Sequence, residues 1–486
     1  MLGTLIKKEI TETILDLRFV IATLLCLVLI PLGVYVSIKD YEQRLQEYQT
    51  AVQQYEQRNK EHMYRANLEA EGYRPPSPLS VFSRGLKEQL RLKVTTQYNG
   101  NYHIENLSQD ETSQAVLFGK IDFAYIASTV LSLLALIFTF RTVTGEKESG
   151  TLKLMIAGSV PRWKVVFSKM VGNYVVFLMP FLLSFLVSLL VINNSEALSL
   201  FALPYIGTIV LLLVITLLFL FCIFGLGTLV SVLTHSSIVS MIGVLFVWVL
   251  LALVIPKIST MIAEIVYPVR SKQIVDTEKA MVLAEIDKEQ EKAEADLYRK
   301  VLAEAGLGVD RAFDDTEETE RARDEYDKQK EPVLRKYQER ISKEIRRIEN
   351  DYANKRRIQA AIAANLSRIS PVCCFTYALS EISGTGSAEV KNFSEKAQQF
   401  QDTVKQNHYN YFEYSEYRLE NRWTGGYFRK DEYDPGKASV PHMSNYRHIS
   451  FAKALSVCWV DIVLLVLFSV LFFAGAFVSF LRYDVR

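Results

Sequence analysis

Uncharged apolar runs alternate with long charged segments along this chain of 486 residues. Each apolar run is long enough to cross a bilayer as a helix, which takes about 20 residues. The run from 197 to 256 has no charged side chain and is too long for one crossing, so we expect the chain to reverse within it, at 234–237. The pattern predicts six transmembrane helices, at residues 19–37, 122–141, 171–192, 203–232, 237–256 and 455–481.

The first 18 residues form an amphipathic pattern of their own. Apolar side chains and Thr13 fall on one helical face, with Lys7, Lys8 and Glu12 elsewhere. This pattern favours a helix that lies in the membrane interface over residues 1–18. An early start of the first span is the alternative. No obvious small-residue cleavage site follows the first apolar run, so the pattern is not that of a cleaved signal peptide.

Two charged segments, 38–121 and 257–453, separate the spans and carry helical repeats. The first segment has apolar positions at spacings of four and three, which is typical of a coiled coil. The second has similar stripes at 276–305 and from Pro332, a good first helical position, to 366. We expect these helices to pack into an elongated stalk. For the aromatic-rich region at 401–450 we expect one of two roles: the core of a domain, or a surface that binds glycan or lipid.

The predicted fold class is therefore mainly α: a polytopic membrane protein with six transmembrane helices, an N-terminal interfacial helix and a helical, coiled-coil-like domain outside the bilayer. Basic residues in short connections predict its orientation. The 142–170 loop and both chain ends are basic, whereas the connection at 193–203 has no Lys or Arg. Both termini, this loop and the tail at 482–486 are thus predicted to be cytoplasmic. The segments 38–121 and 257–453 are predicted to be extracytoplasmic, since long domains cross regardless of charge.

Composition and motifs argue against several function classes. A net charge of +1 gives no reason to expect a nucleic-acid partner, and five cysteines are too few for a disulfide framework. The sequence lacks the G-x-x-x-x-G-K-[ST] phosphate loop, and also H-E-x-x-H and G-x-S-x-G. Its six histidines are scattered. We therefore expect no bound cofactor, no metal and no enzyme activity in this chain.

Polar residues near the bilayer are candidates for function. Asp461 lies near the predicted outer end of the sixth span, and Asp122 at that of the second. Both carboxylates form a candidate intramembrane polar site, or they lie at the level of the lipid headgroups. Gly225, Gly227 and Ser231 let helices approach closely, which suits a homodimer interface, a lateral gate or packing within one chain.

The 142–170 loop has a punctuated pattern. Gly145 and Gly150 interrupt it, residues 151–157 can form a short helix, and Pro161 ends the segment. Acidic residues precede the short helix, where the helix dipole favours them. From this pattern alone, the loop is either an ordinary basic connection or a surface helix that contacts a cytoplasmic partner.

The residues of this loop resemble the permease subunits of ABC-2-type transporters. The resemblance lies in E-K-E-S-G-T-L-K-L-M at 146–155, S-V-P-R at 159–162 and Lys169 just before the third span. The predicted six spans and interfacial helix are similar to the plan of that family. More loosely, residues 75–86 and 369–386 resemble a branch of the family with a large extracytoplasmic domain of unknown function.

In that family the segment after the second span is a coupling helix that docks on a separate ATPase subunit. The resemblance implies that the ATPase contact involves Glu146, Glu148, Gly150, Thr151, Leu152 and Leu154. It implies that the return into the third span is set by Pro161, Arg162 and Lys169.

The resemblance also implies two copies of this chain with two ATPase subunits, which hold ATP and Mg, in the plasma (inner) membrane of a prokaryote. The expected function is ATP-driven export of a substrate that the sequence does not specify. One alternative is a mechanotransmission complex, in which the stalk acts on an extracytoplasmic protein and nothing crosses the bilayer. Another is a membrane scaffold or sensor without an ATPase.

Overall fold

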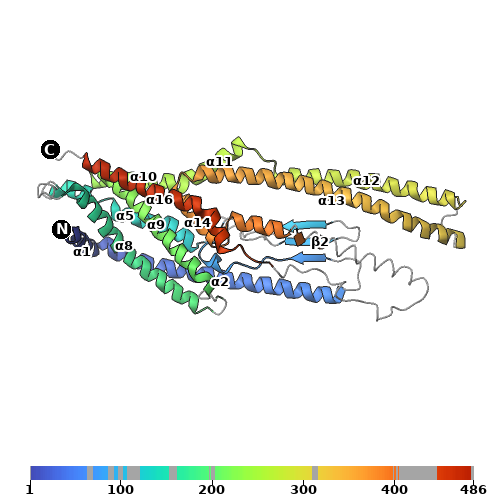
Figure 1. Cartoon of the computed structure of the whole chain (residues 1–486), viewed down its shortest axis with the longest axis horizontal. Helices are drawn as coiled ribbons and strands as arrows, with labels where there is room; N and C mark the ends of the chain where they lie inside the picture. Colours follow the sequence, from blue (N-terminus) through green and yellow to red (C-terminus); the bar gives the residue numbers. More distant parts are fainter. Residues whose placement is uncertain are drawn as a thin grey trace.

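The computed structural model describes residues 2–62, 69–85, 92–96, 102–106, 121–152, 161–195, 198, 203–308, 316–397, 399–400, 403 and 446–482. Within this part of the chain, six helices are long and apolar enough to cross a membrane, as the sequence predicts. The protein is elongated, with a helical bundle at one end and two long helices reaching away from it (Figure 1). We call the bundle end with α1 (Leu2–Ile14) and the last turn of α16 (Phe451–Leu481) the terminal end. The opposite end is the hairpin end.

Three of the spans are single helices: α8 (Arg162–Asn193), α9 (Leu203–Leu233) and α16. The first span is part of α2 (Leu17–His62), which continues beyond the length of a bilayer crossing. The second and fifth spans are composite, because each contains a π-helical turn between α-helical pieces. Their pieces are α4 (Phe123–Tyr125), η2 (Ile126–Leu131) and α5 (Ser132–Thr139), and then α10 (Ser237–Val249), η3 (Leu250–Val254) and α11 (Ile255–Val266).

The chain reverses at 234–236, between α9 and α10, so the predicted reversal is confirmed. The fifth span continues as helix past its expected end at 256, through α11. Pro256 follows the π-helical turn η3 directly. Its missing N–H leaves a carbonyl of that turn without a helical partner, and the Ser370 hydroxyl donates to the Leu251 carbonyl there. α1 is a helix of its own, separated from α2 by a break at 15–16 and packed along α8. The first residues are therefore not an early start of the first span.

Aromatic side chains fill the space between the spans. The rings of Phe138 and Phe177 meet edge to face with their centroids 5.4 Å apart, and Phe177 also packs on Phe224 at 5.2 Å. α9 lies centrally, because α5, α8 and α16 all pack against it. A buried apolar core of this kind fixes how the helix ends are placed relative to one another.

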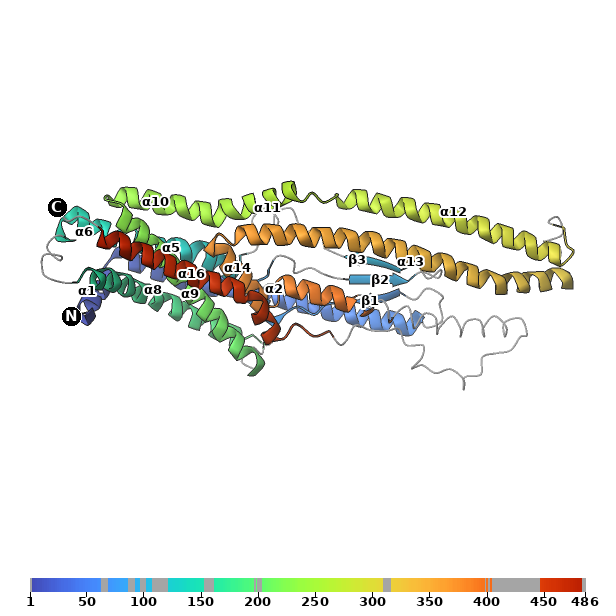
Figure 2. The ribbon, with the colours of Figure 1, turned by 45° about the horizontal axis from the view of Figure 1, so that its top comes forward.

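The hairpin end carries α12 (Lys272–Glu304) and α13 (Glu317–Ser367), which run side by side (Figures 1 and 2). Ion pairs join them along their length, including Lys279 with Glu349 at 2.7 Å and Lys330 with Glu294 at 2.9 Å. α13 begins well before Pro332, so the expected helix start at this proline is wrong. The true start lies after Thr316, whose side chain forms a capping box.

The expected stalk of three helices is not what forms. Among the described elements, α12 and α13 pair with each other, while α2 packs on α8 and on the turn η1 (Pro78–Val81). The segment 38–121 also contains a small sheet that the helical prediction missed. Its strands β1 (Glu69–Gly72), β2 (Leu92–Thr96) and β3 (Tyr102–Asn106) are antiparallel in the order β1-β2-β3. The sheet lies between α2 and α13 in both views (Figures 1 and 2).

The register of this sheet pairs Ala70 with Val94 and Val94 with Ile104. Most of the aromatic-rich region at 401–450 lies outside the described residues. Its final residues contact the helical stretch that follows α14, where Tyr446 and His448 both contact the buried Glu389 carboxylate.

The stretches at 75–85 and 369–386 dock on each other at the hairpin end of the bundle. Ser77 donates to the Ser383 carbonyl oxygen at 2.9 Å, and Thr385 donates to the Ser83 carbonyl oxygen at 2.9 Å. Just before Ser383 lies α14 (Pro371–Ile382), a short helix buried against α9 and α16. The ring of its Phe375 stacks on that of Phe219 of α9 at 4.3 Å. Distant parts of the chain thus close one end of the bundle together.

We predict that Gly227→Ala destabilises the bundle. A Cβ atom at Gly227 would collide with the Thr139 side chain of α5, and overpacking of this kind costs about 1–3 kcal/mol. Thermal unfolding in detergent should show a lower midpoint for this variant. Gly207→Ala in the same helix is the matched control, because a Cβ there meets nothing within 4 Å. Equal midpoints for the two variants would contradict the packing argument.

Candidate functional site

The segment that the sequence singles out begins with a short helix, α6 (Thr144–Ser149). It ends at Gly150, whose φ of 73° lies in the left-handed region. Helices commonly end on a glycine in this conformation, because other residues pay a steric cost there. Thr151 and Leu152 begin a second helical stretch. The rest of the helix expected at 151–157, with Leu154, lies outside the described residues.

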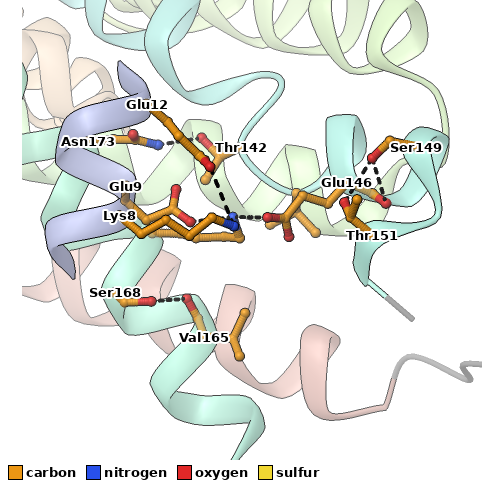
Figure 3. A network of polar contacts seen from close by, with 12 residues as sticks. Lys8, Glu9, Glu12, Thr142, Glu146, Ser149, Thr151, Val165, Ser168 and Asn173 are labelled. Carbon is orange, nitrogen blue, oxygen red and sulfur yellow. Dashed lines mark hydrogen bonds and ion pairs between the residues drawn. The ribbon is translucent and has the colours of Figure 1, made fainter. Parts of the chain in front are cut away.

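The ammonium group of Lys169 lies between two carboxylates at the terminal end. Lys169 of α8 donates to Glu9 Oε1 of α1 at 2.8 Å and to Glu146 Oε1 of α6 at 2.6 Å. Figure 3 shows Glu9 and Glu146 approaching this contact from opposite sides. The Lys169 side chain is 3% exposed. A charge so far from water is tolerated only when it is paired and hydrogen-bonded, so α1, α6 and α8 must all be in place.

A second set of polar contacts joins the same helices without a net charge. Thr13 of α1 donates to Asn173 Oδ1 at 2.6 Å, and Asn173 Nδ2 donates to the Thr142 hydroxyl at 3.1 Å. Close approach of α1 to α8 requires a glycine at 172, because a Cβ there would lie 2.7 Å from the Glu9 Cβ. The approach of the two helices places Glu9 beside Lys169.

The next two residues of α6 hold the turn between α9 and α10. Lys147 Nζ donates to the Val232 carbonyl at 2.6 Å and the Thr234 carbonyl at 2.8 Å, at the end of α9. Glu148 accepts hydrogen bonds from the Ser237 backbone N–H at 2.7 Å and the Ser237 hydroxyl at 2.6 Å, at the start of α10. Both charges match the helix dipoles, positive at a C-terminus and negative at an N-terminus.

We call the residues Glu146, Lys147 and Glu148, with their partners on α8, α9 and α10, the α6 hub. Glu9 of α1 belongs to it through Lys169. Ser231 adds to it by accepting from the Val143 backbone N–H at 3.0 Å. Apolar contacts continue the hub toward α16. Leu152 is buried in a cluster with these other side chains: Val143, Val165, Val166, Val232 and Phe480. Arg162 donates to the Leu481 carbonyl at 2.7 Å, at the end of α16.

The residues predicted to contact an ATPase divide into two groups. Gly150 and Thr151 are exposed, as are Glu148 and Ser149 beside them, and Pro161 is exposed at the start of α8. Leu152 and most of Glu146 are turned into the protein. The exposed group forms the tip of the hub and the inward group joins the tip to the bundle. Direct ATPase contact by any of these residues stays a prediction.

The two intramembrane candidates lie apart from the α6 hub. Asp461 is 1% exposed and forms a two-point ion pair with Arg368, at 2.6 Å and 3.1 Å. Arg368 ends α13, so the pair joins the hairpin to α16. Nearby, Ser370 donates to the Leu251 carbonyl in η3 at 2.6 Å. Asp122 accepts from the backbone N–H groups of Arg84 at 2.9 Å and Tyr125 at 2.7 Å.

The small residues of α9 make contacts within the chain. Gly225 faces Phe472 of α16, where a Cβ would lie 3.3 Å from the Phe472 Cβ, and Gly227 faces Thr139 of α5. Ser231 contacts the start of α6. In the described part of the chain, these residues therefore serve intrachain packing, one of the three roles that the sequence left open.

Sequence reasoning missed the partners that define the hub. Glu9 lies 160 residues from Lys169, and no local pattern links the two. The only signal in the sequence was the presence of basic side chains that need acidic or carbonyl partners. Lys169 stands at the edge of an apolar run, and Lys147 lies within one turn of two glutamates. Only the packing of the helices shows which opposite charges meet.

The fold and the hub together define a polytopic helical membrane protein whose span ends are joined by one short, charged segment. In comparison with known families, residues 4–485 match the ABC-2 family transporter proteins. The chain therefore belongs to that family. No curated protein matches it. Membership favours a permease subunit of an ABC transporter and argues against a scaffold or sensor without an ATPase.

We predict that Lys169→Met strongly destabilises the protein. The substitution leaves the Glu9 and Glu146 carboxylates facing each other without a cation, and breaking a buried ion pair in this way costs about 3–5 kcal/mol. Thermal unfolding in detergent measures the effect. The triple variant Glu9→Gln/Glu146→Gln/Lys169→Met should recover part of the loss, because it leaves no unpaired charge. If the single and triple variants unfold alike, the charge argument fails. Lys164→Met in the same helix is the control.

Proposed function

We propose that this chain is the membrane subunit of an ATP-driven ABC-2-type exporter in a prokaryotic plasma membrane. In this proposal two copies pair with two ATPase subunits, which hold ATP and Mg. The terminal end, with both chain ends, faces the cytoplasm, and the α12–α13 hairpin lies on the extracytoplasmic side. The observation that carries the proposal is the α6 hub, since one short segment contacts α8, α9 and α10 directly and is linked to α1 through Lys169.

The hub gives a physical route for coupling. An ATPase that contacts the exposed tip at 148–151 would displace α6. Lys147 and Glu148 hold the α9–α10 turn through charge-assisted hydrogen bonds, which are stronger than neutral ones, so this turn would move with α6. The ion pairs of Lys169 would carry the same displacement to α1 and α8. Rearranging four helix ends together is a way to open a path through the bundle.

The roles of the predicted residues follow from this route. Gly150 and Thr151, with Glu148 beside them, form the surface that meets the ATPase. Glu146 and Leu152 transmit the movement, because their side chains point into the bundle. Arg162 links the return into α8 with the end of α16. The substrate class is left open by these contacts.

Mechanotransmission is a second candidate, supported by the joint between the hairpin and the bundle. Arg368 and Ser370 fasten the end of α13 to α16 and η3. A movement of the fifth or sixth span would therefore swing the hairpin. In this version the hairpin acts on an extracytoplasmic protein and nothing crosses the bilayer.

The first test is co-purification from mild detergent with identification of the proteins that accompany the tagged chain. We expect an ABC ATPase with the wild type. Thr151→Arg should lose it, because the substitution places a bulky charge on the exposed tip, while Thr260→Arg on α11 should retain it. Absence of an ATPase from folded wild-type protein would refute the proposal. If the ATPase still co-purifies with Thr151→Arg, the ATPase contact does not lie at the tip.

A second prediction separates export from mechanotransmission. Spin labels at Arg321, near the hairpin tip, and at Lys8 on α1 report the distance between the two ends of the protein. Mechanotransmission predicts an ATP-dependent change in this distance that is lost in Arg368→Met/Asp461→Asn, a variant without an unpaired buried charge. Arg340→Met, which breaks an exposed ion pair within the hairpin, is the control and should keep the change. An unchanged distance in the wild type argues for export alone.

A further inference from the structure

An apolar stripe on α11 has no cover among the described residues. Ile258, Met261, Ile262 and Ile265 recur at helical spacing, and Val266 adjoins them; all five are exposed, Ile265 to 72%. Another side of α11 is different, since Ser259 and Ala263 are buried where α11 packs on α13. The stripe is therefore a second face of α11, turned away from the chain's own core.

The outer part of the stripe, with Ile265 and Val266, lies too far along the fifth span for lipid to cover it. This span runs from Ser237 to Val266, and about 20 residues from Ser237 suffice to cross the hydrocarbon core. That count ends near the exposed Lys257. At about 1.5 Å per residue, Ile265 lies roughly 12 Å farther out, beyond the headgroup layer. Lipid tails cover apolar residues of α10, but they do not reach the outer part of α11.

The face of α10 that adjoins the stripe inside the bilayer favours a second copy of this chain as the partner. Of the six spans, α10–η3–α11 is the least buried within the chain, and residues 237–256 carry no charge. Two copies in one bilayer have the same orientation, so a two-fold axis along the membrane normal relates them. Each residue near that axis then meets its own counterpart at the same depth. An uncharged stripe parallel to the axis is complementary to itself.

The size of the stripe also fits a second copy. From their exposed fractions, its five side chains present at most about 500 Å² per copy. Their full burial in two copies would give roughly 1,000 Å², the lower bound for a specific protein interface. The exposed face of α10 continues the contact inside the bilayer and adds to this area.

We infer that the α11 stripe is a contact between two copies of this chain that begins at the outer edge of the bilayer and continues beyond it, with Ile265 facing Ile265 of the second copy. This inference rests on the proposed pairing of two permease chains and specifies where they touch. The contact brings two α12–α13 hairpins together at their bases. The two hairpins then move as one body rather than independently.

Disulfide crosslinking in native membranes tests the inference. The five native cysteines are buried, so the wild type gives the background. Ile265→Cys and Ile262→Cys place a thiol on the stripe. Glu264→Cys is the matched control, at the same height but turned by about 100° around the helix. Two differently tagged copies of each variant are co-expressed, oxidised with copper phenanthroline and separated without reductant.

We expect Ile265→Cys to give a reductant-sensitive dimer carrying both tags, at least roughly tenfold more than Glu264→Cys, because only facing Cα atoms within bonding range form a disulfide. Equal yields for the stripe and the control, or an adduct with the mass of another protein, would overturn the inference. Co-purification of the ATPase is measured on the same membranes. A missing crosslink with the ATPase retained refutes only the α11 contact. A crosslink without an ATPase supports the contact and refutes the proposed function.

Discussion

One ammonium group inside the protein sets the arrangement of the terminal end. Lys169 is almost fully removed from water, and a lone charge there would cost more free energy than a domain has to spare. It stays ionised because Glu9 and Glu146 reach it from two other helices. α1 must therefore lie close to α8, and Gly172 permits that approach. The position of α6 follows from the same requirement.

The hairpin end uses the same physics with different residues. Arg368 pairs with the buried Asp461 and so fixes the end of α13 to α16. Between the two charged joints, the spans hold together by apolar and aromatic packing, and the second and fifth contain π-helical turns. Such turns leave backbone groups that need other partners, and the Ser370 hydroxyl meets the Leu251 carbonyl in one of them. Each π-helical turn thus lies within its span, between the terminal end and the hairpin end, which the charged contacts hold in place.

Family membership and the hub address different parts of the question. The match over residues 4–485 places the chain among the ABC-2 transporter proteins, but it assigns no residue a role. The hub supplies the residues, since one segment of a few residues contacts three helices and is linked to a fourth, α1, through Lys169. The α12–α13 hairpin and the small sheet are the features that set this chain apart from a bare six-span bundle. The ion pair of Arg368 with Asp461 attaches the hairpin directly to α16 of the bundle.

The sequence by itself determined the spans, the reversal at 234–237 and the exposed segment after the second span. These follow from local properties: the length of apolar runs, helix-breaking residues and the placement of basic side chains. It also indicated the hairpin helices, but it placed the start of α13 at Pro332 because the acidic first turns lack an apolar stripe. The sheet at 69–106 was missed because its strands are short and the connection between β1 and β2, residues 73–91, is long.

Tertiary structure alone decided which charges meet and which helices pair. The partners Glu9 and Lys169 are 160 residues apart, and Arg368 and Asp461 are 93 apart. Nothing within a window of one helix can reveal such pairs. Packing likewise decided that α13 pairs with α12 and not with α2, because each of the three helices has an apolar stripe. Many helix pairs can bury such a stripe, whereas the position of a charge in a low-dielectric interior admits very few partners.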